Sequence, residues 1–149
     1  MKEYQKNYWP LIVWALALLP AMLGAAALAE RAGLDSRAMT ALMMAVVVIM
    51  LIGLMWIILK GGYVYWINGG PSFEEAKAAG CEARREYARR HFDAMLKGGA
   101  AALTLLAAEY ALGAHEIVMV LSVGVCVVIA AVSTIRIRWT EEGQDDSKN

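Results

Sequence analysis

Long apolar runs alternate with charged segments along this chain. The apolar runs cover residues 8–29, 38–60, 98–114 and 117–135. An α-helix needs roughly 17–25 apolar residues to cross a bilayer core of about 30 Å, and each run has a length in that range. The pattern therefore predicts an all-α membrane protein with four transmembrane helices, in which residues 1–139 form a single bundle.

The charged segment 61–97 lies between the second and third apolar runs. Residues 61–71 combine glycines with aromatic side chains, which is typical of a loop at the membrane interface. Ser72 and Glu75 have the spacing of a capping box, and this predicts a helix that starts at Phe73. Acidic and basic side chains then recur at helical spacing to about residue 96. We therefore expect one cytoplasmic amphipathic helix, joined to the third span by a hinge at Gly98-Gly99.

The other boundaries follow from short polar segments. Asp35 or Ser36 is placed to cap the helix of the second apolar run. Only residues 113–116 separate the last two spans, so we expect a tight helical hairpin there. Beyond Trp139 the chain is polar and acidic, which predicts a disordered tail at 140–149.

The distribution of cationic residues predicts the orientation. Of the 14 lysines and arginines, only Arg31 and Arg37 fall between the first and second spans. The others lie near the two termini or in residues 60–97, which four spans place on one side of the membrane. Cytoplasmic segments carry the excess of lysine and arginine, so both termini are expected in the cytoplasm.

The overall composition agrees with a membrane protein and excludes some partners. Apolar residues make up 60% of the chain and charged residues 19%, against about 45–50% and about 25% in soluble domains. The formal net charge is zero, and no nucleic-acid-binding module is recognisable, so a nucleic-acid partner is not expected. Cys81 and Cys126 fall in different environments, which argues against a disulfide framework.

The segment 60–75 resembles a motif in a family of small bacterial integral membrane proteins. The residues that carry the resemblance are Lys60-Gly61-Gly62-Tyr63, Ile67, Gly69, Ser72 and Glu74-Glu75. Gly70-Pro71 depart from the family's pattern, and this chain has an extra helix before the motif. The resemblance implies a bacterial origin, but the family has no settled function to transfer. Together with the predicted spans, it leads us to expect a multi-pass protein of the bacterial inner (plasma) membrane.

A basic run is a candidate site for lipid headgroups. It contains Arg84, Arg85, Arg89 and Arg90, followed by His91, and lies just inside the membrane. Anionic headgroups attract such clusters by about 1 kcal/mol per charge near the surface. The alternative is a solvated helix face that nearby glutamates and Asp93 neutralise.

Two further groups are candidates for ion chemistry. Glu109 is the only carboxylate within a predicted span, and with Tyr110 it is a candidate for an ion or proton pathway; alternatively it reaches water at the rim or bonds a neighbour. Methionine and histidine at helical spacing suit Cu(I), and the residues concerned are His115, Met119, Met39 and Met43. Methionine is also ordinary filler of apolar gaps.

Small residues on the third span predict close helix packing, within the bundle or between protomers. These residues are Gly98, Ala102, Ala107 and Ala111.

No catalytic motif is recognisable, so neither an enzyme nor a cofactor is expected. We expect a small integral membrane protein that contacts lipid and either self-associates or serves as a subunit or regulator of a larger membrane complex. The alternative is a small oligomeric transporter or channel for protons or cations, possibly metal ions, that uses Glu109.

Overall fold

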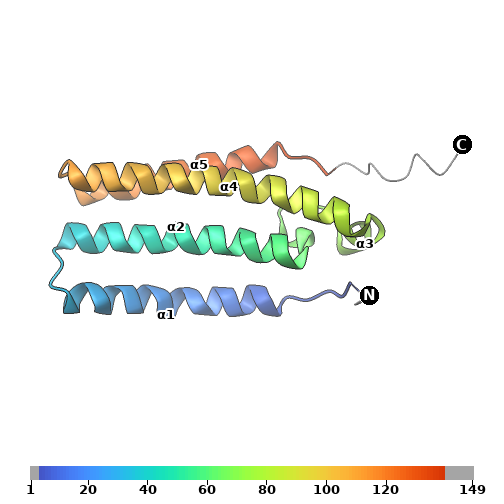
Figure 1. Cartoon of the computed structure of the whole chain (residues 1–149), viewed down its shortest axis with the longest axis horizontal. Helices are drawn as coiled ribbons and strands as arrows, with labels where there is room; N and C mark the ends of the chain where they lie inside the picture. Colours follow the sequence, from blue (N-terminus) through green and yellow to red (C-terminus); the bar gives the residue numbers. More distant parts are fainter. Residues whose placement is uncertain (1–3, 140–149) are drawn as a thin grey trace, which may run out of the picture.

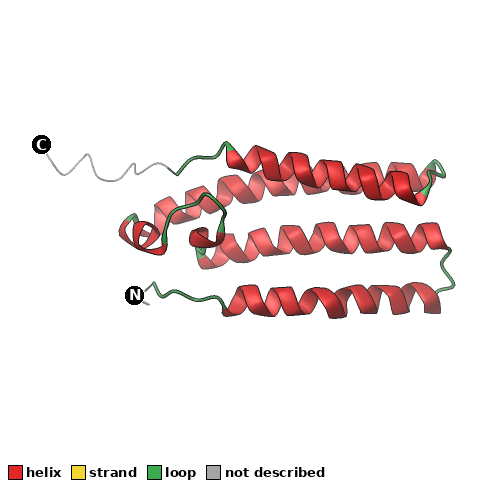
Figure 2. Cartoon of the chain, turned by 180° about the vertical axis from the view of Figure 1, so that it is seen from behind, coloured by secondary structure: helices red, strands yellow, loops and turns green. Residues whose placement is uncertain are grey.

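The chain is all-helical in the computed structural model, which describes residues 4–139 (Figures 1 and 2). The helices are α1 (Trp9–Arg31), α2 (Ser36–Gly61), the short 3-10 helix η1 (Val64–Trp66), α3 (Phe73–Ala78), α4 (Gly80–Ala111) and α5 (Glu116–Ile135). No strand occurs among residues 4–139, so the predicted all-α class is confirmed. The predicted tail at 140–149 lies outside the described residues.

The four long helices run along one common direction (Figure 1). Helices α1, α2 and α4 lie side by side, and α5 packs on α4 and α2. The turns that join α1 to α2 and α4 to α5 lie at one end. The amino-terminal segment, η1, α3 and the chain after α5 lie at the opposite end. The charged and aromatic segments are thereby gathered at a single end of the molecule.

Three helices are long and apolar enough to cross a membrane, which corrects the prediction of four spans plus a separate amphipathic helix. These three are α1, α2 and α5. The charged segment and the predicted third span instead form one helix, α4. Its apolar part runs from Gly98 only to the helix end at Ala111, which is shorter than the roughly 17 residues that a spanning helix needs.

The expected hinge at Gly98-Gly99 is wrong, because α4 continues through both glycines. The glycines allow close packing there. A Cβ atom on Gly98 would lie 2.4 Å from the Cβ of Ala130 in α5, and one on Gly99 would lie 2.6 Å from Cδ1 of Ile52 in α2. The chain turns at Gly80 instead, where φ is +83°, a value that side-chain-bearing residues rarely adopt.

The predicted helix caps are confirmed. Asp35 accepts a hydrogen bond from the backbone N–H of Ala38 at 2.7 Å and starts α2. Ser72 and Glu75 form the capping box of α3, in which each side chain accepts a hydrogen bond from the other residue's backbone N–H. The box starts a helix of only one and a half turns, and α4 begins after it at Gly80.

The helices enclose two apolar clusters. In the first, α2, α4 and α5 meet, and its buried members are Val48, Ala102, Leu106, Met119 and Val123. The second lies at the charged end of the molecule and contains Ile58, Val64, Ala76, Tyr87 and Ala88.

Helix α1 packs against α2 alone among the helices. Trp14 in α1 donates its indole N–H to the carbonyl of Met50 in α2 at 3.0 Å. Most large apolar side chains of α1 remain exposed, as expected of a helix whose outer surface faces lipid.

Candidate functional site

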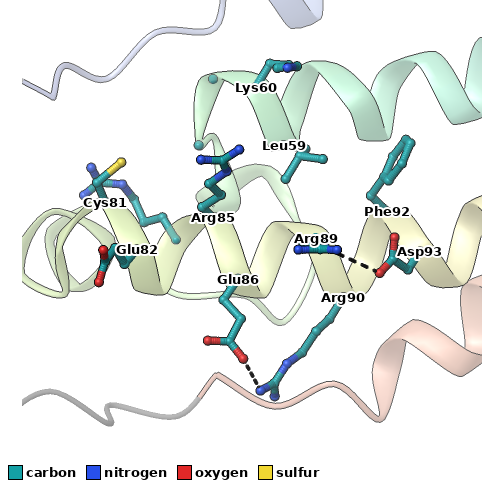
Figure 3. Close-up of a pocket in the computed structure, with 13 residues that line it drawn as sticks. Leu59, Lys60, Cys81, Glu82, Arg85, Glu86, Arg89, Arg90, Phe92 and Asp93 are labelled. Carbon is teal, nitrogen blue, oxygen red and sulfur yellow. Dashed lines mark hydrogen bonds and ion pairs between the residues drawn. The ribbon is translucent and has the colours of Figure 1, made fainter.

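A cleft of about 1220 Å³ lies between the end of α2 and the first half of α4 (Figure 3). We call it the basic cleft. Its lining residues are Leu59, Lys60, Gly61, Gly62, Cys81, Glu82, Arg84, Arg85, Glu86, Arg89, Arg90, Phe92 and Asp93. Five of them are cationic and three are acidic, so the cleft carries a net positive charge.

Two helical ion pairs neutralise only part of this charge. Glu86 pairs with Arg90, and the Nε of Arg89 lies 3.9 Å from Asp93. All four side chains are more than half exposed, and such pairs contribute little binding energy in water. Arg85 has no acidic partner within ion-pair distance among residues 4–139. The exposed guanidinium groups are therefore available to an anion that enters the cleft.

The fourth arginine, Arg84, is placed differently. Its side chain is buried, and Nη1 donates a hydrogen bond to the carbonyl of Ala76 in α3 at 2.7 Å. Its guanidinium carbon lies 3.8 Å from the ring centroid of Tyr4. No acidic group lies within ion-pair distance of Arg84 in the described part of the chain. Arg84 thus sets a fixed positive charge into the wall of the basic cleft, while Arg85, Arg89 and Arg90 are exposed.

The amino-terminal segment holds this end together through aromatic contacts. The Tyr4 hydroxyl donates to the carbonyl of Gly62 at 2.6 Å, and its ring stacks on Phe73 at 5.2 Å between centroids. Burial raises the pKa of Tyr4 to about 12. The Tyr65 hydroxyl donates to the carbonyl of Asn7 at 2.9 Å and accepts from its N–H at 2.9 Å. These contacts fix the chain around Gly62, which is part of the cleft wall.

His91 follows the arginine run in the sequence, but its side chain does not lie on the basic surface that the arginines form. Its side chain is buried, and Nδ1 lies 3.0 Å from the carbonyl of Tyr87. Burial lowers the pKa of His91, which favours the neutral imidazole near pH 7. The Tyr87 ring contacts the rings of both His91 and Trp139. His91 is thus part of the packing behind the cleft.

Glu109 and Tyr110 lie at the far end of the molecule from the basic cleft. The Ser122 hydroxyl of α5 donates to Oε2 of Glu109 at 2.7 Å, and the carboxylate is half-buried. Arg37 donates from Nη2 to the carbonyl of Tyr110 at 2.9 Å. Both predicted pathway residues therefore join α4 to a neighbouring helix.

The candidate copper ligands differ in burial and in their contacts. His115 caps α5, where Nδ1 accepts from the N–H of Ile117 at 3.3 Å. Met119 is fully buried in the first apolar cluster, and Met39 and Met43 are half-buried on α2. Among residues 4–139, no group of three histidine, cysteine or acidic side chains is arranged to hold a metal ion.

The small residues of the predicted third span divide into two pairs. Gly98 and Ala102 pack inside the chain, with Gly98 against α5 and Ala102 fully buried in the first apolar cluster. Ala107 and Ala111 are exposed. Part of the predicted packing face is therefore used within one protomer.

Of the residues that line the basic cleft, only the four arginines were among the predicted site residues, and Lys60 and Phe92 are two of those that were missed. The only sequence signal was the position of Lys60 at the end of an apolar run. Phe92 follows the arginine run, and its position in the sequence gave no indication that it lines the cleft.

No family model, curated protein or solved structure matches this chain. The resemblance of residues 60–75 to a bacterial family therefore stays a prediction.

Proposed function

We propose that this chain is a non-enzymatic integral membrane protein that binds phosphate-bearing lipid headgroups in the basic cleft. The observation that carries the proposal is the group of exposed guanidiniums at the cleft, set beside the buried charge of Arg84. Guanidinium groups suit phosphate oxygens because their N–H donors form a planar fork. The cleft lies at the end of the apolar helix α2, where a headgroup layer would meet it.

In this proposal α1, α2 and α5 are the full spans, and α4 runs beside them through the membrane with an apolar part shorter than an ordinary span, because α2 and α5 pack against it. Both termini and the basic cleft then face the cytoplasm, and the membrane is the bacterial inner membrane. The gathering of the amino-terminal segment, α3 and the chain after α5 at one end supports a shared side for both termini. The excess of cationic residues at that end supports the cytoplasmic side.

In this proposal the protein catalyses no reaction. It associates with copies of itself, or serves as a subunit or regulator of a larger membrane complex. The support is the open arrangement of the helices. Helix α1 packs on α2 alone, so its outer face and the exposed pair Ala107 and Ala111 are open to a neighbouring membrane protein.

One observation favours the alternative of an oligomeric proton or cation pathway. The half-buried side chain of Glu109, near the end of α4, accepts a hydrogen bond from Ser122 on α5. The test is proton or cation flux into proteoliposomes that contain either the parent chain or the Glu109→Gln variant. Loss of flux in the variant would support this alternative, whereas equal flux in both proteins would reject it.

Lipid binding to the purified full chain in detergent tests the main proposal. Dioctanoyl phosphatidylglycerol is titrated against the chain, with dioctanoyl phosphatidylcholine as the neutral comparison and glycerol 3-phosphate as the free headgroup. At about 1 kcal/mol per charge, Arg85→Gln and Arg89→Gln should each weaken phosphatidylglycerol binding about fivefold, and together about thirtyfold. Arg31→Gln, an exposed cation at the other end, is the matched control and should change nothing.

Unchanged affinity in the double variant, or equal affinity for the neutral lipid, would overturn the proposal. Binding of glycerol 3-phosphate as tight as that of the lipid would assign the cleft to a soluble phosphate compound instead.

A further inference from the structure

A second hollow lies on the other flank of α4, where that helix meets α5. Its volume is about 640 Å³, and we call it the α4–α5 groove. It shares only Arg90 and Asp93 with the basic cleft. Lys97 and Ala101 extend its α4 wall, and Ile129 lies on its α5 wall.

The two ends of the groove differ in polarity. Arg90, Asp93 and Lys97 lie along the charged part of α4, whereas Ala101 follows one turn into the apolar part. Cys126 and Ile129 come from α5, which is one of the helices apolar enough to span a membrane. The groove therefore runs from a charged rim to an apolar floor.

Gly98 and Ala130 both line the groove, at a point where α4 and α5 approach closely. These residues bring α4 and α5 so close that a Cβ on Gly98 would lie 2.4 Å from that of Ala130. Ala101 is a small, exposed residue on the α4 wall, and Ile129 is a larger, exposed residue on the α5 wall.

The rim carries more positive than negative charge. Asp93 lies near Arg89 and Arg90 pairs with Glu86, both at exposed positions. Lys97 has no acidic partner within ion-pair distance among residues 4–139. An anion at the rim would meet the ammonium group of Lys97 without displacing an existing ion pair.

We propose that the α4–α5 groove holds one anionic phospholipid. Its phosphate lies at Arg90 and Lys97, and one acyl chain lies along Ala101, Cys126 and Ile129. The positive charge of the rim matches the phosphate of this ligand, and the apolar floor matches its acyl chain. The inference goes beyond the proposed function, because it adds a second site with an acyl-chain contact and does not require the basic cleft to be occupied.

Native mass spectrometry of the full chain in detergent tests the inference. The protein is mixed with dioleoyl phosphatidylglycerol, and the bound lipids that survive mild collisional activation are counted. Ala101→Leu places a branched side chain into the apolar floor from an exposed position. This variant should retain one lipid fewer than the parent chain, and the affinity for that lipid should fall at least tenfold. Ala108→Leu is the matched control, because Ala108 is also exposed on α4 but does not line the groove.

Lys97→Gln tests the charged rim separately and should weaken the same binding step about fivefold. The double variant Arg85→Gln/Arg89→Gln should leave this step unchanged, so failure of the groove and failure of the basic cleft are distinguishable. The inference is overturned if Ala101→Leu retains as many lipids as Ala108→Leu. It is also overturned if dioleoyl phosphatidylcholine is retained equally, or if glycerol 3-phosphate displaces the lipid.

Discussion

The guanidinium of Arg84 lies over the ring of Tyr4, with 3.8 Å between the guanidinium carbon and the ring centroid. Arg84 also bonds the carbonyl of Ala76, so a single cation joins α4, α3 and the amino-terminal segment. Cation–π contacts of desolvated groups are worth about 2 kcal/mol or more. The contact fixes the end of the molecule at which the basic cleft forms.

Loss of this cation should destabilise the fold. Arg84→Met keeps much of the apolar stem but removes the cation–π contact and the bond to Ala76, and we expect it to lower the free energy of unfolding by about 2–4 kcal/mol. Thermal or denaturant unfolding in detergent micelles measures the change. Arg85→Met, at the adjacent exposed position, should cost less than about 0.5 kcal/mol. Equal effects of the two substitutions would contradict the role of Arg84.

The hydroxyl of Tyr4 should make stability depend on alkaline pH. Its pKa is about 12 in the fold against 10.0 for the free side chain, so the unfolded chain loses this proton first as pH rises. The stabilising contribution of Tyr4 is therefore complete below pH 10 and declines between pH 10 and about 12. Tyr4→Phe should remove this part of the decline and cost about 1 kcal/mol at neutral pH through the lost bond to Gly62. Unfolding curves at pH 8 and pH 11 make the comparison; an unchanged slope in the variant would refute it.

His91 should make stability depend on acidic pH. Burial lowers its pKa below the ordinary 6.5, so the unfolded chain binds the proton first as pH falls. Its contribution to stability is present above pH 6.5 and is lost as pH falls through the lowered pKa. Unfolding measured from pH 8 to pH 5 should show a decline that His91→Gln reduces. If the two proteins lost stability in parallel, another group would be responsible.

The contact between Gly98 and Ala130 should not tolerate an added methyl group. Gly98→Ala places a Cβ 2.4 Å from that of Ala130, and overpacking typically costs about 1–3 kcal/mol. Gly124→Ala is the matched control on α5, because a Cβ there meets nothing within 4 Å. It should be neutral or stabilise the helix by up to about 1 kcal/mol.

The paired variant Gly98→Ala/Ala130→Gly separates this contact from a general effect on α4. Moving the methyl group to the other helix should recover most of the lost unfolding free energy in detergent. No recovery would mean that Gly98 is needed for a different reason.

The helix caps and apolar runs were predictable because they depend on residues near each other in sequence. The bond from Ala38 to Asp35 and the capping box of Ser72 and Glu75 join residues three apart. The length of an apolar run is likewise read directly along the chain. These local features determined the class of the protein, the bounds of α1, α2 and α5, and the start of α3.

Residues far apart in sequence needed the tertiary structure. Arg84 and Arg85 are adjacent cations in the sequence, yet one is buried against Tyr4 and the other is exposed. Gly98-Gly99 has the composition of a hinge, but the packing of α4 against α2 and α5 makes it a straight contact segment. The two hollows beside α4 arise in the same way, because their walls come from helices that meet only after folding. Sequence periodicity sets which faces of a helix are apolar, whereas the choice of neighbour for each face depends on packing between distant segments.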